Sequence, residues 1–61
     1  MLTLREQEVL QLIADGLSNK AIAERLVLAE GTVKLHLHRI YSKLQVNGRV
    51  QAIQKANESK I

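Results

Sequence analysis

The chain has 61 residues, a mass of 6.8 kDa and a formal net charge of +3, so it is one small basic domain spanning residues 1–61. A chain of this length buries only about 60% of the surface that its unfolded form exposes, which leaves no room for two cores or a substrate-enclosing active site. The absence of cysteine excludes disulfides and thiolate-ligated zinc. No apolar run approaches the roughly 20 residues of a membrane span, and no secretory signal is visible. We expect a cytoplasmic helical domain with no membrane partner.

The distribution of charge is more informative than the total. Residues 1–17 contain one basic and three acidic side chains, whereas residues 18–49 contain six basic and two acidic ones. A basic middle after an acidic start suggests one face turned toward a polyanion. Unevenness of this size is also common on ordinary solvated surfaces. The charge alone therefore does not decide between a face that binds nucleic acid and an ordinary surface.

A first helix is predicted over residues 4–15. Thr3 and Glu6 have the S/T-x-x-E spacing of a capping box, in which each side chain satisfies a free backbone N–H at the helix start. Gly16 follows the segment as a stop signal. Within this segment Val9, Leu12 and Ile13 recur at helical spacing, and Leu10 broadens the apolar stripe.

Two further helices follow after short connections. Ser18 is a suitable N-cap for a short helix over residues 19–26, whose apolar face comprises Ile22, Ala23 and Leu26. Residues 27–29 form an apolar connection to a longer helix over residues 30–44. Its apolar stripe steps by four, three and four residues through Val33, Leu37, Ile40 and Leu44. Two helices joined in this way have the outline of a helix-turn-helix.

A last helix is predicted over residues 48–57, with Asn47 as its cap and a frayed tail over residues 58–61. Its apolar positions are Val50, Ile53 and Ala56 at three-residue steps, with Ala52 beside them. The predicted fold class is therefore all-α, a compact four-helix domain with a central helix-turn-helix.

The outer face of the third helix carries an unusual combination of side chains. At about 100° per residue, Lys34, Leu35 and His38 lie opposite the apolar stripe, as does Ser42. One interpretation is that Leu35 is an ordinary exposed leucine. The other is that Leu35 contacts a thymine methyl group while Lys34 and His38 reach base edges or phosphates in the major groove of DNA. The absence of acidic residues after Glu30 in this helix favours the second interpretation.

Neither a metal site nor a catalytic site is predicted. His36 and His38 are two residues apart and so point about 200° apart on a helix, whereas chelation needs a spacing of three or four. His36 is expected to hydrogen-bond backbone or phosphate nearer the flank. Glu6 and Glu8 lie on different helix faces, and no glycine-rich loop could hold a nucleotide. We expect no cofactor and no enzymatic activity.

The start of the second helix breaks a local rule. Lys20 lies in its first turn, where the helix dipole disfavours a cation by a few tenths of a kcal/mol. A phosphate at this position would reverse that penalty, and Ser18, Asn19 and Lys20 together with free backbone N–H groups could bind one. The alternative is a surface lysine tolerated at small cost.

The chain contains several ordered sequence blocks. They are L-T-x-R-E-x-E-V-L from residue 2, G-L-S-N-K-x-I-A from residue 16, T-V-K-x-H from residue 32 and I-Y-S-K-L from residue 40, followed by Val46, Asn47 and Arg49. Together these blocks resemble the C-terminal DNA-binding domain of the LuxR/FixJ/NarL group of bacterial transcription regulators. The resemblance covers about residues 2–56. It implies sequence-specific binding of double-stranded DNA by the output domain of a regulator.

The resemblance also assigns roles to residues. Base edges would be contacted by Lys34, Leu35 and His38. Phosphates would be contacted by Asn19, Lys20, Thr32, His36 and Lys43, beside the Ser18 noted above. The last helix would be the dimerisation surface, through Arg49, Val50, Ala52, Ile53 and Ala56. The alternative for the apolar residues of that helix is that they only cover the first helix.

The resemblance further implies a homodimer on paired half-sites about one helical turn apart, with only weak association of the isolated domain. RNA polymerase is a candidate partner, and the domain would lie at the nucleoid when it is bound to DNA. Control would come from a receiver or ligand-sensing domain that these 61 residues do not contain. The chain would then be either an output module or a small free-standing regulator. A helical module that binds an acidic protein remains the alternative function.

Three positions depart from the family pattern. Gln45 replaces the usual glycine after the third helix, so a left-handed residue there would cost about 1 kcal/mol unless the turn adjusts. Ala29 replaces a serine or threonine cap, which forgoes about 1 kcal/mol. Leu35 is larger than the common valine, which leaves the preferred base open.

Overall fold

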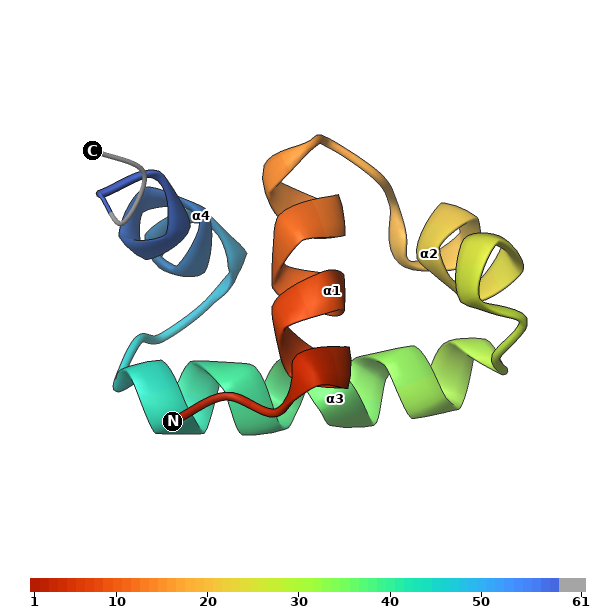
Figure 1. Cartoon of the computed structure of the whole chain (residues 1–61), viewed down its shortest axis with the longest axis horizontal. Helices are drawn as coiled ribbons and strands as arrows, with labels where there is room; N and C mark the ends of the chain where they lie inside the picture. The colour runs from red at the N-terminus through yellow and green to blue at the C-terminus, as the bar shows by residue number, and fades with distance from the viewer. Residues whose placement is uncertain (59–61) are drawn as a thin grey trace.

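The computed structural model describes residues 1–58, which form four helices and no strands. They are α1 (Leu4–Ala14), α2 (Asn19–Leu26), α3 (Glu30–Leu44) and α4 (Arg49–Glu58). Helix α3 runs along the long axis of the molecule, α1 crosses it near its middle, and α2 and α4 lie toward its two ends (Figure 1). The predicted all-α fold is confirmed, and every helix bound agrees with its prediction to within one residue.

The predicted caps of α1 and α2 are present. The Thr3 hydroxyl accepts a hydrogen bond from the Glu6 N–H at 3.1 Å, and the Thr3 N–H donates to Glu6 Oε1 at 2.8 Å. Ser18 Oγ accepts a hydrogen bond from the Ala21 N–H at 3.1 Å. These side chains satisfy backbone donors that would otherwise lack partners at the helix starts.

The start of α4 corrects one prediction. Its first helical residue is Arg49, and Gly48 lies directly before it. The Gly48 carbonyl accepts a hydrogen bond from the Ala52 N–H at 3.1 Å, which opens the helical pattern. Asn47, the predicted cap, therefore lies one residue too early to cap this helix.

The core is formed by one buried cluster that draws on all four described helices. Its members are Val9, Ile13, Ile22, Ala23, Val33, Leu37, Ile40 and Ala52. In α4 the buried position is Ala52, whereas Val50, from the predicted three-residue stripe, is 64% exposed. Ala52 is the buried position because α4 packs mainly against α1, and its small side chain permits a close approach of the two helices.

Among residues 1–58, three turn the chain with positive φ. Gly16 follows α1 with φ +94°, as its role as a stop signal predicts. Gln45 ends α3 at φ 57°, ψ 46°, so the turn keeps its left-handed residue and does not adjust. Val27 ends α2 at φ 57°, ψ 51° and is 89% exposed, which the sequence did not reveal. A β-branched residue in this conformation is a strained exception.

The predicted frayed tail falls mostly outside the described residues. Glu58 is the last residue of α4 and so belongs to the helix. Residues 59–61 are not part of the described structure.

Candidate nucleic-acid interface

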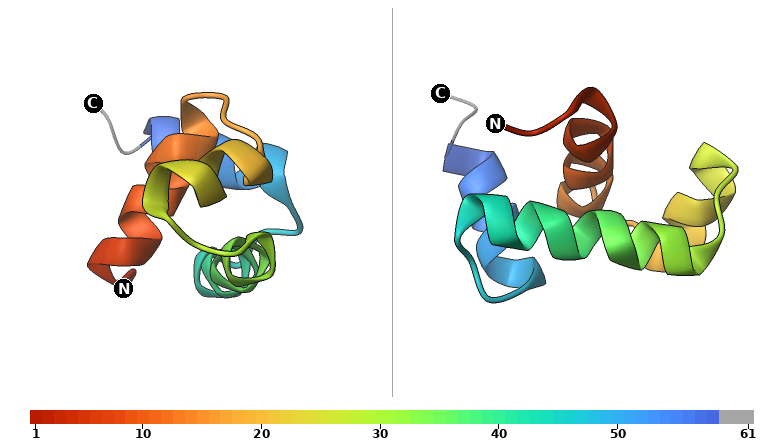
Figure 2. Two further views of the ribbon diagram at one scale, coloured as in Figure 1. Left: turned by 90° about the vertical axis from the view of Figure 1, so that its right-hand side faces the viewer. Right: turned by 90° about the horizontal axis from the view of Figure 1, so that it is seen from below.

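The outward side of α3 is free of packing. When the molecule is viewed from below relative to Figure 1, α3 lies in front of the other helices (Figure 2, right). Val33, Leu37 and Ile40 are buried on its inner side, whereas Lys34 and His38 are exposed. Leu35 is 48% exposed, so an apolar side chain is presented to solvent beside two basic residues.

The predicted phosphate-binding group lies at the start of α2, with Ser18 as the N-cap and Asn19 and Lys20 in the first turn. Ser18 and Lys20 are exposed and Asn19 is half-buried. The Ser18 oxygen accepts the bond from Ala21, so the hydroxyl proton is still available to a ligand. Lys20 forms no ion pair with any residue of the described chain. These residues therefore combine an uncompensated cation with a helix N-terminus.

Arg49, the first residue of α4, binds this same start of α2 and the residue that precedes its N-cap. Its Nη1 donates to Asn19 Oδ1 at 3.0 Å, and its Nη2 donates to the carbonyl oxygen of Leu17. The two acceptors lie 30 and 32 residues away in the sequence. The guanidinium that the resemblance assigned to the dimerisation surface is thus bound within the monomer. No local sequence signal points to this contact.

Lys43, a predicted phosphate contact, is bound to a carboxylate. Its Nζ donates to Glu6 Oε1 at 2.8 Å, and the Glu6 side chain is almost fully buried. The hydrogen bond from Lys43 and that from the Thr3 N–H lower the pKa of Glu6 to about 2, against the smaller opposing effect of burial. Thr32 and His36, the other predicted phosphate contacts on α3, are half-buried.

The five residues predicted for dimerisation differ in their surroundings. Val50 is exposed, and Ile53 and Ala56 are half-buried, so these three retain surface that another protein could contact. Ala52 is fully buried in the monomer core. Arg49 is half-buried and turned toward α2.

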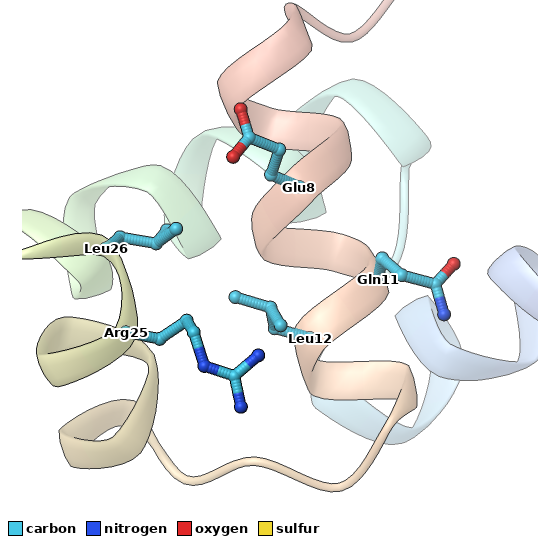
Figure 3. A pocket seen from close by; sticks show the side chains of 5 residues that line it. All are labelled: Glu8, Gln11, Leu12, Arg25 and Leu26. Carbon is cyan, nitrogen blue, oxygen red and sulfur yellow. The ribbon is translucent and has the colours of Figure 1, made fainter.

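A hollow of about 410 Å³ lies between α1 and α2. It is lined by Glu8, Gln11, Leu12, Arg25 and Leu26, with the two leucines directed toward each other across it (Figure 3). None of the residues predicted to contact DNA lines it, so the hollow is separate from the outward face of α3.

Metal-binding clusters and membrane-spanning helices are both absent from residues 1–58. In this range no group of three or more histidine, cysteine, aspartate or glutamate side chains is arranged to hold a metal ion. None of the described helices combines the length and apolarity needed to cross a membrane.

Helices α2 and α3 are joined by residues 27–29, and the outer face of α3 is exposed and basic. This arrangement defines a helix-turn-helix domain. Residues 1–56 match the family described as bacterial regulatory proteins, luxR family. The chain therefore belongs to the luxR family, and the resemblance read from its sequence blocks is confirmed. It is a helix-turn-helix output domain of the kind found in LuxR/NarL-type transcription regulators, a class that implies DNA binding and is not a class of enzymes.

Named relatives agree with this assignment. The transcriptional regulatory protein DegU of Brevibacillus brevis is 53% identical over 53 residues, which cover 87% of this chain and 22% of that protein. The nitrate/nitrite response regulator NarL of Escherichia coli K12 is 43% identical over 60 residues, covering 98% of this chain and 28% of that protein. The crystal structure of the response regulator ChrA, from a heme-sensing two-component system, superposes with a TM-score of 0.92 at 47% identity, covering 98% of this chain and 30% of that one. The chain spans less than a third of the length of each.

Proposed function

We propose that this domain binds double-stranded DNA sequence-specifically, with α3 in the major groove. Lys34 and His38 reach base edges or nearby phosphates, and Leu35 contacts a thymine methyl group. The observation that carries the proposal is the 48% exposure of Leu35 between two exposed basic side chains on an unpacked helix face. Contact with a methyl group removes the exposed surface of this apolar side chain from water, which is favourable.

Phosphate contacts fix the position of α3 in the groove. Ser18, Asn19 and Lys20 bind one DNA strand at the start of α2, where the free backbone N–H groups and the helix dipole favour an anion. A second set of contacts comes from the flank of α3. It comprises Thr32, His36 and Lys43, of which Lys43 also neutralises Glu6.

Two copies bind paired half-sites about one helical turn apart and meet through α4. The contact is made by Val50, Ile53 and Ala56, since these side chains retain exposed surface. Buried Ala52 and intramolecularly bound Arg49 support the arrangement from within each monomer. Regulation of transcription makes RNA polymerase a proposed partner, and DNA binding would locate the domain at the bacterial nucleoid in the cytoplasm.

Titration with duplex DNA at several salt concentrations tests the proposal. Release of counterions from phosphates predicts that the logarithm of the affinity falls steeply and linearly with the logarithm of the salt concentration. A flat salt dependence, or no binding, would contradict it and favour a module that binds an acidic protein.

A further inference from the structure

We propose that Arg49 is a positioning residue for DNA binding, which holds the side-chain amide of Asn19 in the orientation that offers its N–H groups to a phosphate. The inference rests on the proposed function, and it gives Arg49 a role other than dimer contact. The carrying observation is the pair of hydrogen bonds from its guanidinium to Asn19 Oδ1 and the Leu17 carbonyl.

The first step concerns the amide itself. An asparagine amide has an acceptor oxygen and a donor nitrogen, and nothing in its own geometry decides which of the two faces outward. Because Nη1 of Arg49 can only donate, it selects Oδ1 of Asn19 as its partner at 3.0 Å. The Nδ2 group makes no hydrogen bond within the described chain, so both of its donors are left for a ligand. A phosphate accepts hydrogen bonds and cannot donate them at neutral pH, so only this orientation is productive.

The second step concerns the backbone. Nη2 of Arg49 donates to the Leu17 carbonyl, directly before the N-cap Ser18. The planar guanidinium thus ties Leu17 in the connection and Asn19 at the start of α2 to the first residue of α4. This fixes the start of α2 relative to the rest of the fold, since α4 itself packs against α1 and α3. The amide of Asn19 is therefore held from a rigid support.

Arg49→Lys isolates this role, because lysine keeps the charge but cannot donate from two coplanar nitrogens. Arg25→Lys, the same change at an exposed arginine elsewhere on α2, is the matched control. Binding is measured on a random-sequence duplex of about one helical turn, so that two domains cannot sit side by side. We expect Arg49→Lys to lower affinity about five- to tenfold with an unchanged salt slope, as for loss of one hydrogen bond. Arg25→Lys is expected to have no effect.

A double-mutant cycle with Asn19→Ala separates positioning from a general loss of structure. In the Asn19→Ala background, Arg49→Lys should lower affinity by a smaller factor than in the wild type, because the amide that it positions is gone and only its bond to Leu17 is lost. Asn19→Asp provides a second separation: its carboxylate keeps the bond to Arg49 and the fold, but offers no donor and repels phosphate. It should retain the melting temperature and bind DNA more weakly than Asn19→Ala.

The outcomes distinguish this inference from the proposed function. If the wild-type chain and Arg25→Lys bind duplex DNA and folded Arg49→Lys binds equally well, the positioning role is wrong while DNA binding stands. The same holds if Arg49→Lys weakens binding equally with and without the Asn19 amide. If the wild-type chain shows no salt-dependent binding, the proposed function itself fails.

Discussion

The ammonium of Lys43 lies 2.8 Å from Oε1 of Glu6, joining the last turn of α3 to the first turn of α1. The same oxygen accepts the N–H of Thr3, so one buried carboxylate serves both the cap of α1 and the contact between two helices. Only 4% of the Glu6 side chain is exposed, whereas 39% of the Lys43 side chain is. Lys43 is thus a structural partner of Glu6 as well as a proposed DNA contact.

Acid sensitivity follows from this pair. The pKa of Glu6 is lowered from 4.5 to about 2, chiefly by Lys43, so the folded state binds this proton more weakly than the unfolded chain does. The resulting stability is fully present above pH 4.5 and is lost as the pH falls toward 2. Glu6→Gln should lower stability at pH 7 and flatten the dependence of stability on pH in this window, as measured by thermal unfolding across pH. Glu8→Gln, at an exposed carboxylate 3.9 Å from Arg5, should do neither.

The left-handed residue at the end of α2 gives a stability prediction of positive sign. Val27→Gly removes the strain of a β-branched residue at φ 57° and should raise the free energy of unfolding by about 1 kcal/mol. In a domain of this size that raises the melting temperature by about 4–8 °C. The same change at Val50, an exposed valine within α4, should lower the free energy of unfolding by a few tenths of a kcal/mol. Destabilisation by Val27→Gly would mean that the turn is not strained.

The missing cap of α3 gives a second prediction of increased stability. Ala29 has the extended conformation of an N-cap, but its side chain makes no capping hydrogen bond. Ala29→Ser supplies an oxygen for a backbone N–H of the first turn and should stabilise the domain by about 1 kcal/mol. Denaturant unfolding measures this change, and slower hydrogen exchange at the first amides of α3 would locate it. An unchanged midpoint would show that these amides are already satisfied by solvent.

Much of the fold is predictable because its signals are local. The Thr3–Glu6 capping box and the Ser18 cap each depend on residues three apart, and the stripe of Val33, Leu37 and Ile40 follows from helical periodicity. The exposure of Leu35 follows from the same periodicity, applied to the opposite face. The basic outer side of α3 is therefore predictable from the sequence.

Features that depend on contacts distant in sequence could not be predicted. Arg49 meets Leu17 and Asn19 across more than 30 residues, and nothing near Arg49 indicates the direction of its side chain. Burial of Ala52 depends on how closely α4 approaches α1, which a repeat of apolar residues does not specify. The strain at Val27 arises because the chain must turn there to bring α3 under α1, against the preference of the residue itself.

The isolated domain should be mainly monomeric in dilute solution. The three α4 side chains available to a partner form a contact much smaller than the roughly 800 Å² per partner of a stable interface. Sedimentation of the 61-residue chain at micromolar concentration should give a single species of about the monomer mass of 6.8 kDa. A tight dimer under these conditions would contradict the expected weakness of the α4 contact.

Selection of bound sequences from a random duplex pool tests the central claim, that α3 reads bases while the start of α2 holds phosphate. The wild-type domain is compared with Lys34→Ala and Lys20→Ala. Lys34→Ala should change the preferred base at a limited number of positions, whereas Lys20→Ala should weaken binding alike on all sequences and reduce the salt slope by about 1. If Lys34→Ala leaves both base preference and affinity unchanged, α3 does not read the major groove.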